Sequence, residues 1–212
     1  MVEGVVRARR PVTLPVVLSR AEVRTLLGEL TGTIWLVGAL LDGSGLRLRE
    51  CLELRIKDID FDRARLAVRQ GKGRKDRLVP LPATLADRLR DHIARVRRQH
   101  ERDLARGEGH VSVPDAFARK VPSAPLDWRW QFVFPAARVC RDPHRGPPGR
   151  LHVHESAVQR AVADAVRRSG ITKRATCHSL RHHTDSRIMP STRSRSAVWP
   201  APDDASSLVR SA

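Results

Sequence analysis

The 212-residue sequence contains no tyrosine, and aromatic residues make up only 4% of it. The absence of tyrosine excludes covalent catalysis through a phenolic oxygen. Cys51, Cys140 and Cys177 are odd in number and widely spaced, so they predict neither a disulfide framework nor a paired metal knuckle. No apolar run approaches the ~20 residues that cross a bilayer, and the basic start lacks the apolar core of a signal peptide. We therefore expect reduced thiols, no membrane partner and a cytoplasmic location.

Positive charge is abundant. Lys and Arg number 40 against 23 Asp and Glu, which gives a formal net charge of +17 at pH 7. Basic groups that neutralise phosphates release counterions, so this balance favours a polyanionic partner such as nucleic acid. Arginine far outnumbers lysine, however, and such an excess can also reflect coding bias. The length and the 41% hydrophobic content are sufficient for one packed domain.

Helix signals dominate the first part of the chain. Ser19 and Glu22 form a capping-box pattern, which predicts a helix from there to about Leu30. Residues 34–41 are apolar on every side and predict a buried helix, which the glycine-rich turn at residues 43–45 ends.

A β-hairpin is predicted next. Residues 46–54 have a helical pattern, and strands are expected at residues 66–69 and 76–81. The Gly-Lys-Gly turn between the strands places Lys72 at the tip of the hairpin.

The second half returns to helices on either side of an irregular segment. One apolar stripe predicts a long helix from Leu85 to the glycine at position 107, and residues 158–166 predict another helix. Residues 107–150 show no steady periodicity and are interpreted as an insertion. Thr176 is expected to cap a helix that carries His178 and Arg181, which lie three residues apart and so share a face. The predicted fold class is mainly α with a small antiparallel β-sheet.

Three short segments become informative through their order. They are residues 45–50 (GLRLRE), 71–77 (GKGRKDR) and 178–182 (HSLRH). In this order and at these separations they resemble the active-site boxes of the tyrosine recombinase and phage integrase family. The resemblance spans roughly residues 14–183 and extends to residues 52–61 and 78–82. It implies the catalytic domain of a site-specific DNA recombinase or integrase, which acts on double-stranded DNA without a cofactor or metal.

Within this family, the insertion resembles the integron integrase branch through residues 113–116 (VPDA) and 128–135 (WRWQFVFP), followed by residues 170–173 (GITK). Its tryptophans, Trp128 and Trp130, have two interpretations. They either stack on DNA bases or anchor the insertion in the fold, and anchoring is the commoner role.

The family chemistry explains the residue types of the three boxes. Attack on a DNA phosphodiester builds negative charge around phosphorus, which planar guanidiniums can clamp with bidentate hydrogen bonds. The resemblance gives this role to Arg47 and Arg181. It makes Lys72 the proton donor to the leaving 5′-oxygen and His178 a phosphate contact or proton carrier. Glu50, one helical turn after Arg47, is the supporting carboxylate.

Each residue also has an ordinary structural interpretation. Arg47 and Glu50 taken alone are solvated or salt-bridged charges, and Lys72 is an exposed turn residue. Lys75 is the alternative proton donor on the same hairpin. A metal cluster is the alternative for His178, because Cys177, His182 and His183 lie close to it in the sequence. A second ligand pair at the usual zinc spacing is missing, however.

The sequence departs from the family at its end. The family nucleophile is a tyrosine on a late helix, and this chain has none. A second His or Trp that the family carries in a Leu-Gly-His context is also missing, since Trp199 matches that context poorly. We therefore expect a truncated catalytic domain that binds DNA with little or no cleavage.

The expected organisation has three parts. Residues 1–18 are a linker remnant, and residues 19–183 form the catalytic domain with the insertion at about 107–150. Residues 184–212 are an aberrant, disordered tail, for which a frameshift is our hypothesis. The family assembles as a tetramer on paired DNA sites, and the altered tail puts that assembly in question. Two alternatives remain: a non-catalytic basic nucleic-acid-binding module, and a pseudogene fragment that folds poorly.

Overall fold

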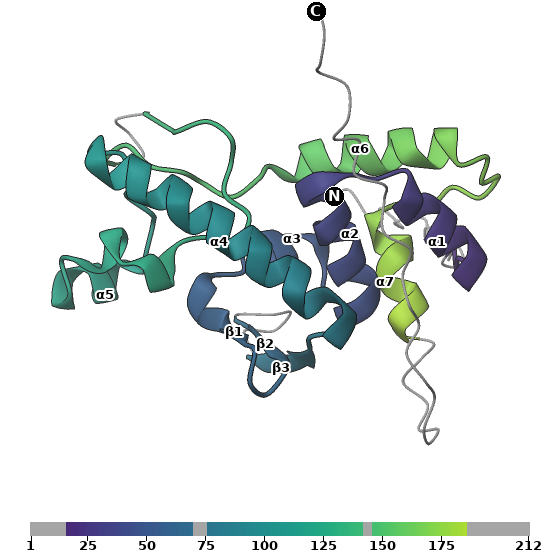
Figure 1. Ribbon diagram of the computed structural model, residues 1–212, viewed down its shortest axis with the longest axis horizontal. Helices are drawn as coiled ribbons and strands as arrows, with labels where there is room; N and C mark the ends of the chain where they lie inside the picture. Colours follow the sequence, from purple (N-terminus) through teal and green to yellow (C-terminus); the bar gives the residue numbers. More distant parts are fainter. Residues whose placement is uncertain (1–15, 70–75, 142–145, 186–212) are drawn as a thin grey trace, which may run out of the picture.

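A computed structural model describes residues 16–69, 76–141 and 146–185, with side chains up to Arg181 (Figure 1). The hairpin tip with Lys72 and Lys75 lies outside the described residues. So do most of the predicted linker remnant and almost all of the predicted tail at residues 184–212.

Seven α-helices and one small sheet make up the described fold. The helices are α1 (Arg20–Gly28), α2 (Gly32–Ser44), α3 (Leu48–Leu52), α4 (Ala83–Ala105), α5 (Asp115–Lys120), α6 (Glu155–Arg168) and α7 (Cys177–Asp185), with short 3-10 helices η1 (Ile56–Asp58), η2 (Ala124–Leu126) and η3 (Trp128–Trp130). Strands β1 (Ile59–Asp60), β2 (Arg65–Val68) and β3 (Arg77–Pro80) form an antiparallel sheet in the order β1-β2-β3. The predicted class, mainly α with a small antiparallel sheet, is confirmed.

The start of α1 follows the predicted capping box. The Glu22 amide donates to the Ser19 hydroxyl at 3.2 Å, and the Ser19 amide donates to the Glu22 carboxylate at 2.6 Å. Both bonds satisfy amides that a helix start leaves without intrahelical partners. The helix ends at Gly28, slightly before the expected end near Leu30.

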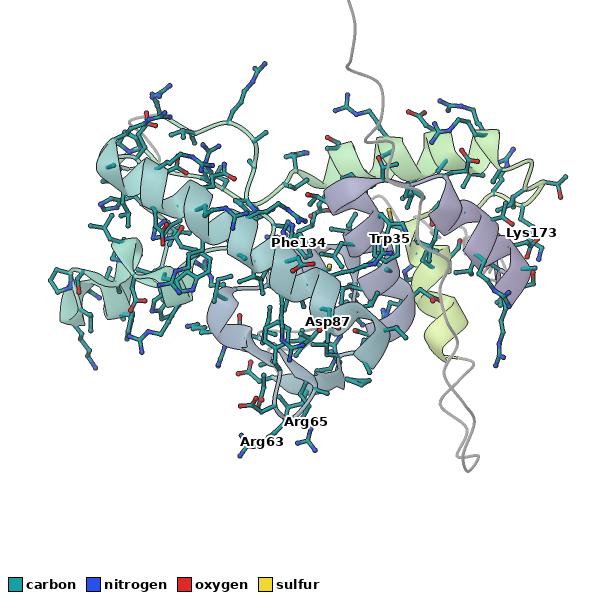
Figure 2. The ribbon with its side chains drawn as sticks, viewed as in Figure 1. Trp35, Arg63, Arg65, Asp87, Phe134 and Lys173 are labelled. Atoms are coloured by element: carbon teal, nitrogen blue, oxygen red, sulfur yellow. The ribbon has the colours of Figure 1, made fainter. Side chains whose placement is uncertain are left out.

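Helix α2 is the central element of the larger core. Its sequence is apolar on every side, and it packs against α1, α3, α4, α7 and β3. Its buried side chains join those of α7, including Leu180, in one hydrophobic cluster. Figure 2 shows Trp35 of α2 and Phe134 within the body of the molecule, whereas Arg63 and Arg65 project from the end of the sheet.

The hairpin is confirmed with small changes in its bounds. Strand β2 pairs with β3 so that Val68 faces Arg77 and Arg65 faces Pro80. Strand β1 was not predicted, because two residues are too short for an alternating pattern. The helix expected at residues 46–54 is also wrong in extent, since α3 covers only Leu48–Leu52.

The irregular segment forms a second, smaller hydrophobic cluster. Val111, Val113, Ala124 and Phe132 are buried there, and Trp130 packs against them. Figure 1 shows α5 at the opposite end of α4 from α1, α6 and α7. The apolar residues of this cluster are not spaced with the period of a helix or a strand. The sequence pattern therefore could not predict the structure of residues 107–150.

Within the part of the chain that the structure describes, no helix combines the length and the apolar character needed to cross a membrane.

Candidate functional site

A pocket of about 350 Å³ lies between α3, α6 and α7. Apolar and ionisable side chains line it together. Its lining residues are Leu46, Arg47, Leu48, Glu155, Gln159, Ala163, Ala175, Thr176, Cys177, His178 and Arg181.

Arg47 enters this pocket because of the turn that ends α2. Gly45 adopts a left-handed conformation with φ of 64°, a backbone geometry that glycine tolerates best. The chain then reverses, and Arg47 takes the N-cap position of α3 with an extended backbone. Its side chain is 37% exposed, so the guanidinium is accessible from the solvent.

Glu50 fixes the position of Arg47 through hydrogen bonds. Its carboxylate accepts hydrogen bonds from the Arg47 backbone amide at 2.8 Å and from the Arg47 Nη1 at 2.7 Å. It also accepts two bonds from Arg77, at 2.8 and 2.6 Å. Burial, the largest single influence, acts to raise the pKa of Glu50, but the bonds from Arg77 and Arg47 outweigh it and lower the pKa to about 2. Glu50 is therefore a carboxylate at neutral pH.

Helix α7 supplies His178 and Arg181. The Thr176 hydroxyl accepts from the His178 amide at 3.2 Å, which confirms Thr176 as the cap of this helix. His178 and Arg181 lie three residues apart and so share a helix face. The Arg181 Nε donates to the Gly45 carbonyl oxygen at 3.0 Å. This bond connects α7 directly to the turn that precedes Arg47.

The structure brings three of the predicted site residues to one pocket. Arg47, His178 and Arg181 line it together, and Glu50 contacts it through Arg47. Lys72 lies outside the described residues. Among the described residues that line the pocket, two carry guanidiniums, Arg47 and Arg181, and one carries a carboxylate, Glu155. The balance of charge suits an oxyanion, which guanidiniums bind through directed N–H donors.

Sequence reasoning missed Arg77 and Glu155. Arg77 belongs to the second sequence box, but its partner Glu50 lies 27 residues earlier, so local spacing gives no signal for the pair. Glu155 stands in the first turn of α6, where acidic residues are common for reasons of helix stability alone. Only the tertiary fold shows that it lines the pocket.

The two tryptophans of the irregular segment contact side chains of the chain itself. The Trp130 ring lies 4.8 Å from that of Phe117 and 2.8 Å from the Lys57 ammonium. The Trp128 ring lies 5.8 Å from that of His100. Both tryptophans are half-buried, which favours the anchoring interpretation.

Comparison with known proteins gives consistent sequence matches. Residues 17–197 match the model of the Phage integrase family. Curated integrase/recombinases from Escherichia coli and Pseudomonas aeruginosa are each 45% identical over 176 residues, which cover 83% of this chain and 52% of the relative. The tyrosine recombinase XerA of Thermococcus kodakarensis is 44% identical over 86 residues, or 39% of this chain and 30% of that protein. This chain therefore spans about half the length of the integrase/recombinases that it matches.

Solved structures show a similar fold. A crystal structure of XerA recombinase superimposes with a TM-score of 0.54 at 24% identity, covering 85% of this chain and 52% of that one. The XerH site-specific recombinase bound to its difH substrate, in a pre-cleavage complex, gives 0.51 at 18% identity, covering 82% and 44%. At these identities the likeness establishes the fold.

Proposed function

The chain belongs to the phage integrase family of tyrosine recombinases, and we propose that its pocket of Arg47, His178 and Arg181 binds a phosphate of DNA. The pocket would serve as part of the catalytic domain of a site-specific DNA recombinase or integrase. Double-stranded DNA is the proposed partner.

The observation that carries this proposal is the convergence of two distant segments. Arg47 is the N-cap of α3 and Arg181 lies in α7, yet both line one pocket. The Arg181 side chain also donates to the backbone carbonyl two residues before Arg47. Arginines on an ordinary solvated surface need no such connection. Two fixed guanidiniums on one pocket match the non-bridging oxygens of a phosphodiester.

The proposed roles follow from the chemistry of each group. Arg47 and Arg181 would hold the phosphate oxygens and stabilise the charge that develops in the transition state. His178, exposed at the first turn of α7, would contact the phosphate or carry a proton. Lys72 remains the proposed proton donor to the leaving oxygen, on the strength of its sequence box. Glu50 would keep Arg47 in place.

These 212 residues include no tyrosine that could attack the phosphate. Charge stabilisation and substrate binding do not need that nucleophile, because they depend on the arginines and the imidazole. We therefore propose that the chain binds DNA without forming a covalent intermediate.

The test is a titration of a short DNA duplex followed by fluorescence anisotropy. We compare the wild type with R47Q/R181Q and with the control R63Q/R65Q, which removes the same charge from the exposed end of the sheet. The pocket variant should bind at least roughly tenfold more weakly, as expected for the loss of charge-assisted bonds worth about 1.5–3 kcal/mol each. The control should change the affinity by less than about threefold, the range of an exposed charge. Equal losses would show that only diffuse positive charge binds the DNA.

The proposal also covers the oligomeric state of the protein and its location in the cell. The tetramer on paired sites that the family resemblance implies stays a prediction, which analytical ultracentrifugation of the DNA complex tests. A cytoplasmic location is supported by Cys51, Cys140 and Cys177, which are all free thiols in the structure.

A further inference from the structure

The carboxylate of Glu50 is shared evenly between two arginines. Its Oε1 accepts from the Nη1 of Arg47 at 2.7 Å and from the Nη1 of Arg77 at 2.8 Å. Its Oε2 accepts from the Arg47 backbone amide at 2.8 Å and from the Arg77 Nη2 at 2.6 Å. Each oxygen thus takes one bond from each arginine, and Arg77 binds in the bidentate geometry that guanidiniums favour.

This sharing has an electrostatic consequence. The Glu50 side chain is only 10% exposed, so water screens its charge weakly. One carboxylate facing two guanidiniums leaves the group with a net positive charge. Without Arg77, Arg47 alone would neutralise the negative charge of Glu50. The carboxylate would then compete with any bound anion for the Arg47 guanidinium.

Arg77 also has a fixed place in the fold. It is the first residue of β3 and pairs with Val68 of β2, while Arg47 caps α3. The Arg77–Glu50 bonds therefore connect the sheet directly to α3, whose N-cap is Arg47. Arg69, the residue after β2, makes a separate ion pair, in which its Nε lies 2.8 Å from the Asp58 carboxylate.

We propose that Arg77 is a positioning residue, which acts through Glu50 to keep the Arg47 guanidinium available to a phosphate in the pocket. The proposal rests on the function proposed above. It adds a residue outside the pocket lining that sets the affinity of the pocket for an oxyanion.

A purely structural role for Arg77 predicts something different. If the pair only fastens the sheet to α3, its loss lowers the thermal stability and leaves the anion affinity of the folded protein unchanged. If Arg77 acts through Glu50, the anion affinity falls even in protein that remains folded, and a lysine at position 77 restores part of it, because an ammonium still neutralises the carboxylate.

The experiment measures the affinity for inorganic phosphate at constant ionic strength, followed by the NMR resonances of the His178 imidazole, which are assigned with H178N. The variants are R77Q, R77K, E50Q and R77Q/E50Q. R47Q serves as the positive control. R65Q is the matched charge control, because Arg65 is exposed on the neighbouring strand β2. Circular dichroism melts establish that each variant is folded at the assay temperature.

We expect R77Q to weaken phosphate binding by roughly tenfold, equivalent to about 1.4 kcal/mol, and R65Q to change it by less than about twofold. R77K should recover at least half of the loss on a logarithmic scale. In the E50Q background, R77Q should have no further effect beyond about twofold, since residues that act through one another are not additive. If R77Q is unfolded at the assay temperature, R77K and R77K/E50Q complete the same cycle.

The outcomes separate the two claims. Phosphate binding that is absent, or unaffected by R47Q, overturns the proposed function and the role of Arg77 with it. Binding that depends on Arg47 but responds to R77Q no more than to R65Q overturns the positioning role alone. Additive effects of R77Q and E50Q also overturn it, because they would mean that Arg77 acts independently of Glu50.

Discussion

The Arg181 Nε donates a hydrogen bond of 3.0 Å to the carbonyl oxygen of Gly45, which lies 136 positions earlier in the chain. This bond joins α7 to the turn between α2 and α3. The geometry of that turn decides where Arg47 lies at the N-cap of α3, so the two pocket arginines are positioned by one local structure. A substitution in this turn should therefore affect the positions of both arginines.

Gly45→Ala should weaken phosphate binding as well as the fold. Alanine at a φ of 64° costs about 1–2 kcal/mol in the left-handed region, and relief of that strain would move the backbone before Arg47. Urea unfolding gives the stability, and phosphate titration gives the affinity. The matched control is Gly170→Ala, which has a φ of 68° and open space around a new Cβ, at the end of α6. It should lose similar stability and retain phosphate binding. Equal affinity losses in both variants would contradict this account.

Leu180→Ala should destabilise the fold strongly, because Leu180 is fully buried beside Arg181 where α7 packs on α2. Large-to-small substitutions in a core cost about 2–5 kcal/mol. Leu78→Ala, which removes the same atoms from a side chain that is 62% exposed on β3, should cost less than about 0.5 kcal/mol. Urea denaturation measures both. Similar costs at the two positions would mean that α7 is not packed as described.

Protein stability should fall as the pH drops below about 6.5, partly because of His92. Burial lowers the pKa of His92 from its ordinary value of 6.5, against the effect of its 2.8 Å bond to the Val133 carbonyl oxygen, and nearby Arg95 lowers it further. The folded state therefore takes up this proton at a lower pH than the unfolded state, whose His92 has the ordinary pKa of 6.5. The stability that depends on neutral His92 is complete above that pH and is lost below it. His100 follows the same direction, again through burial.

The check is the free energy of unfolding between about pH 7.5 and pH 5.5, for the wild type and for H92Q/H100Q. Glutamine can still donate a hydrogen bond to each carbonyl but does not titrate. The double variant should depend less steeply on pH than the wild type does. Parallel pH profiles would show that neither histidine is linked to folding.

No covalent adduct should form with a suicide DNA substrate that carries a nicked recombination site. The reason is that the 212 residues contain no tyrosine to become the phosphotyrosine of the family mechanism. Denaturing gel electrophoresis of the protein with labelled DNA measures this directly. A retarded band that survives boiling in detergent would refute the prediction and would point to another nucleophile.

Much of the fold could be predicted because its signals are local. The Ser19–Glu22 capping box, the glycine turn after α2 and the hairpin strands each depend on residues within a few positions of one another. The predicted bounds of α1, α2 and α3 were less accurate, since tertiary packing decides where a helix ends. Helix α2 continues through Ser44, so only Gly45 of the predicted turn at residues 43–45 lies outside it. Strand β1 exists only because Ile59 and Asp60 pair with β2, and two residues carry no period.

The residues of the candidate site were likewise predictable only in part. Arg47, His178 and Arg181 were found through sequence boxes, and the fold then brought them to one pocket. The Arg77–Glu50 pair and the Glu155 carboxylate in the pocket wall depend on contacts between distant elements. Among so many charged residues, sequence spacing alone cannot select these two from the solvated majority.

The central claim is that Arg47, His178 and Arg181 bind one phosphate together. The most direct measurement is a phosphate titration at constant ionic strength, in which the His178 imidazole resonances of the wild type are compared with those of R47Q and R181Q. We predict saturable shifts in the wild type and at least roughly tenfold weaker binding in each arginine variant. Imidazole shifts that do not saturate, or that are the same in all three proteins, would contradict a shared phosphate site.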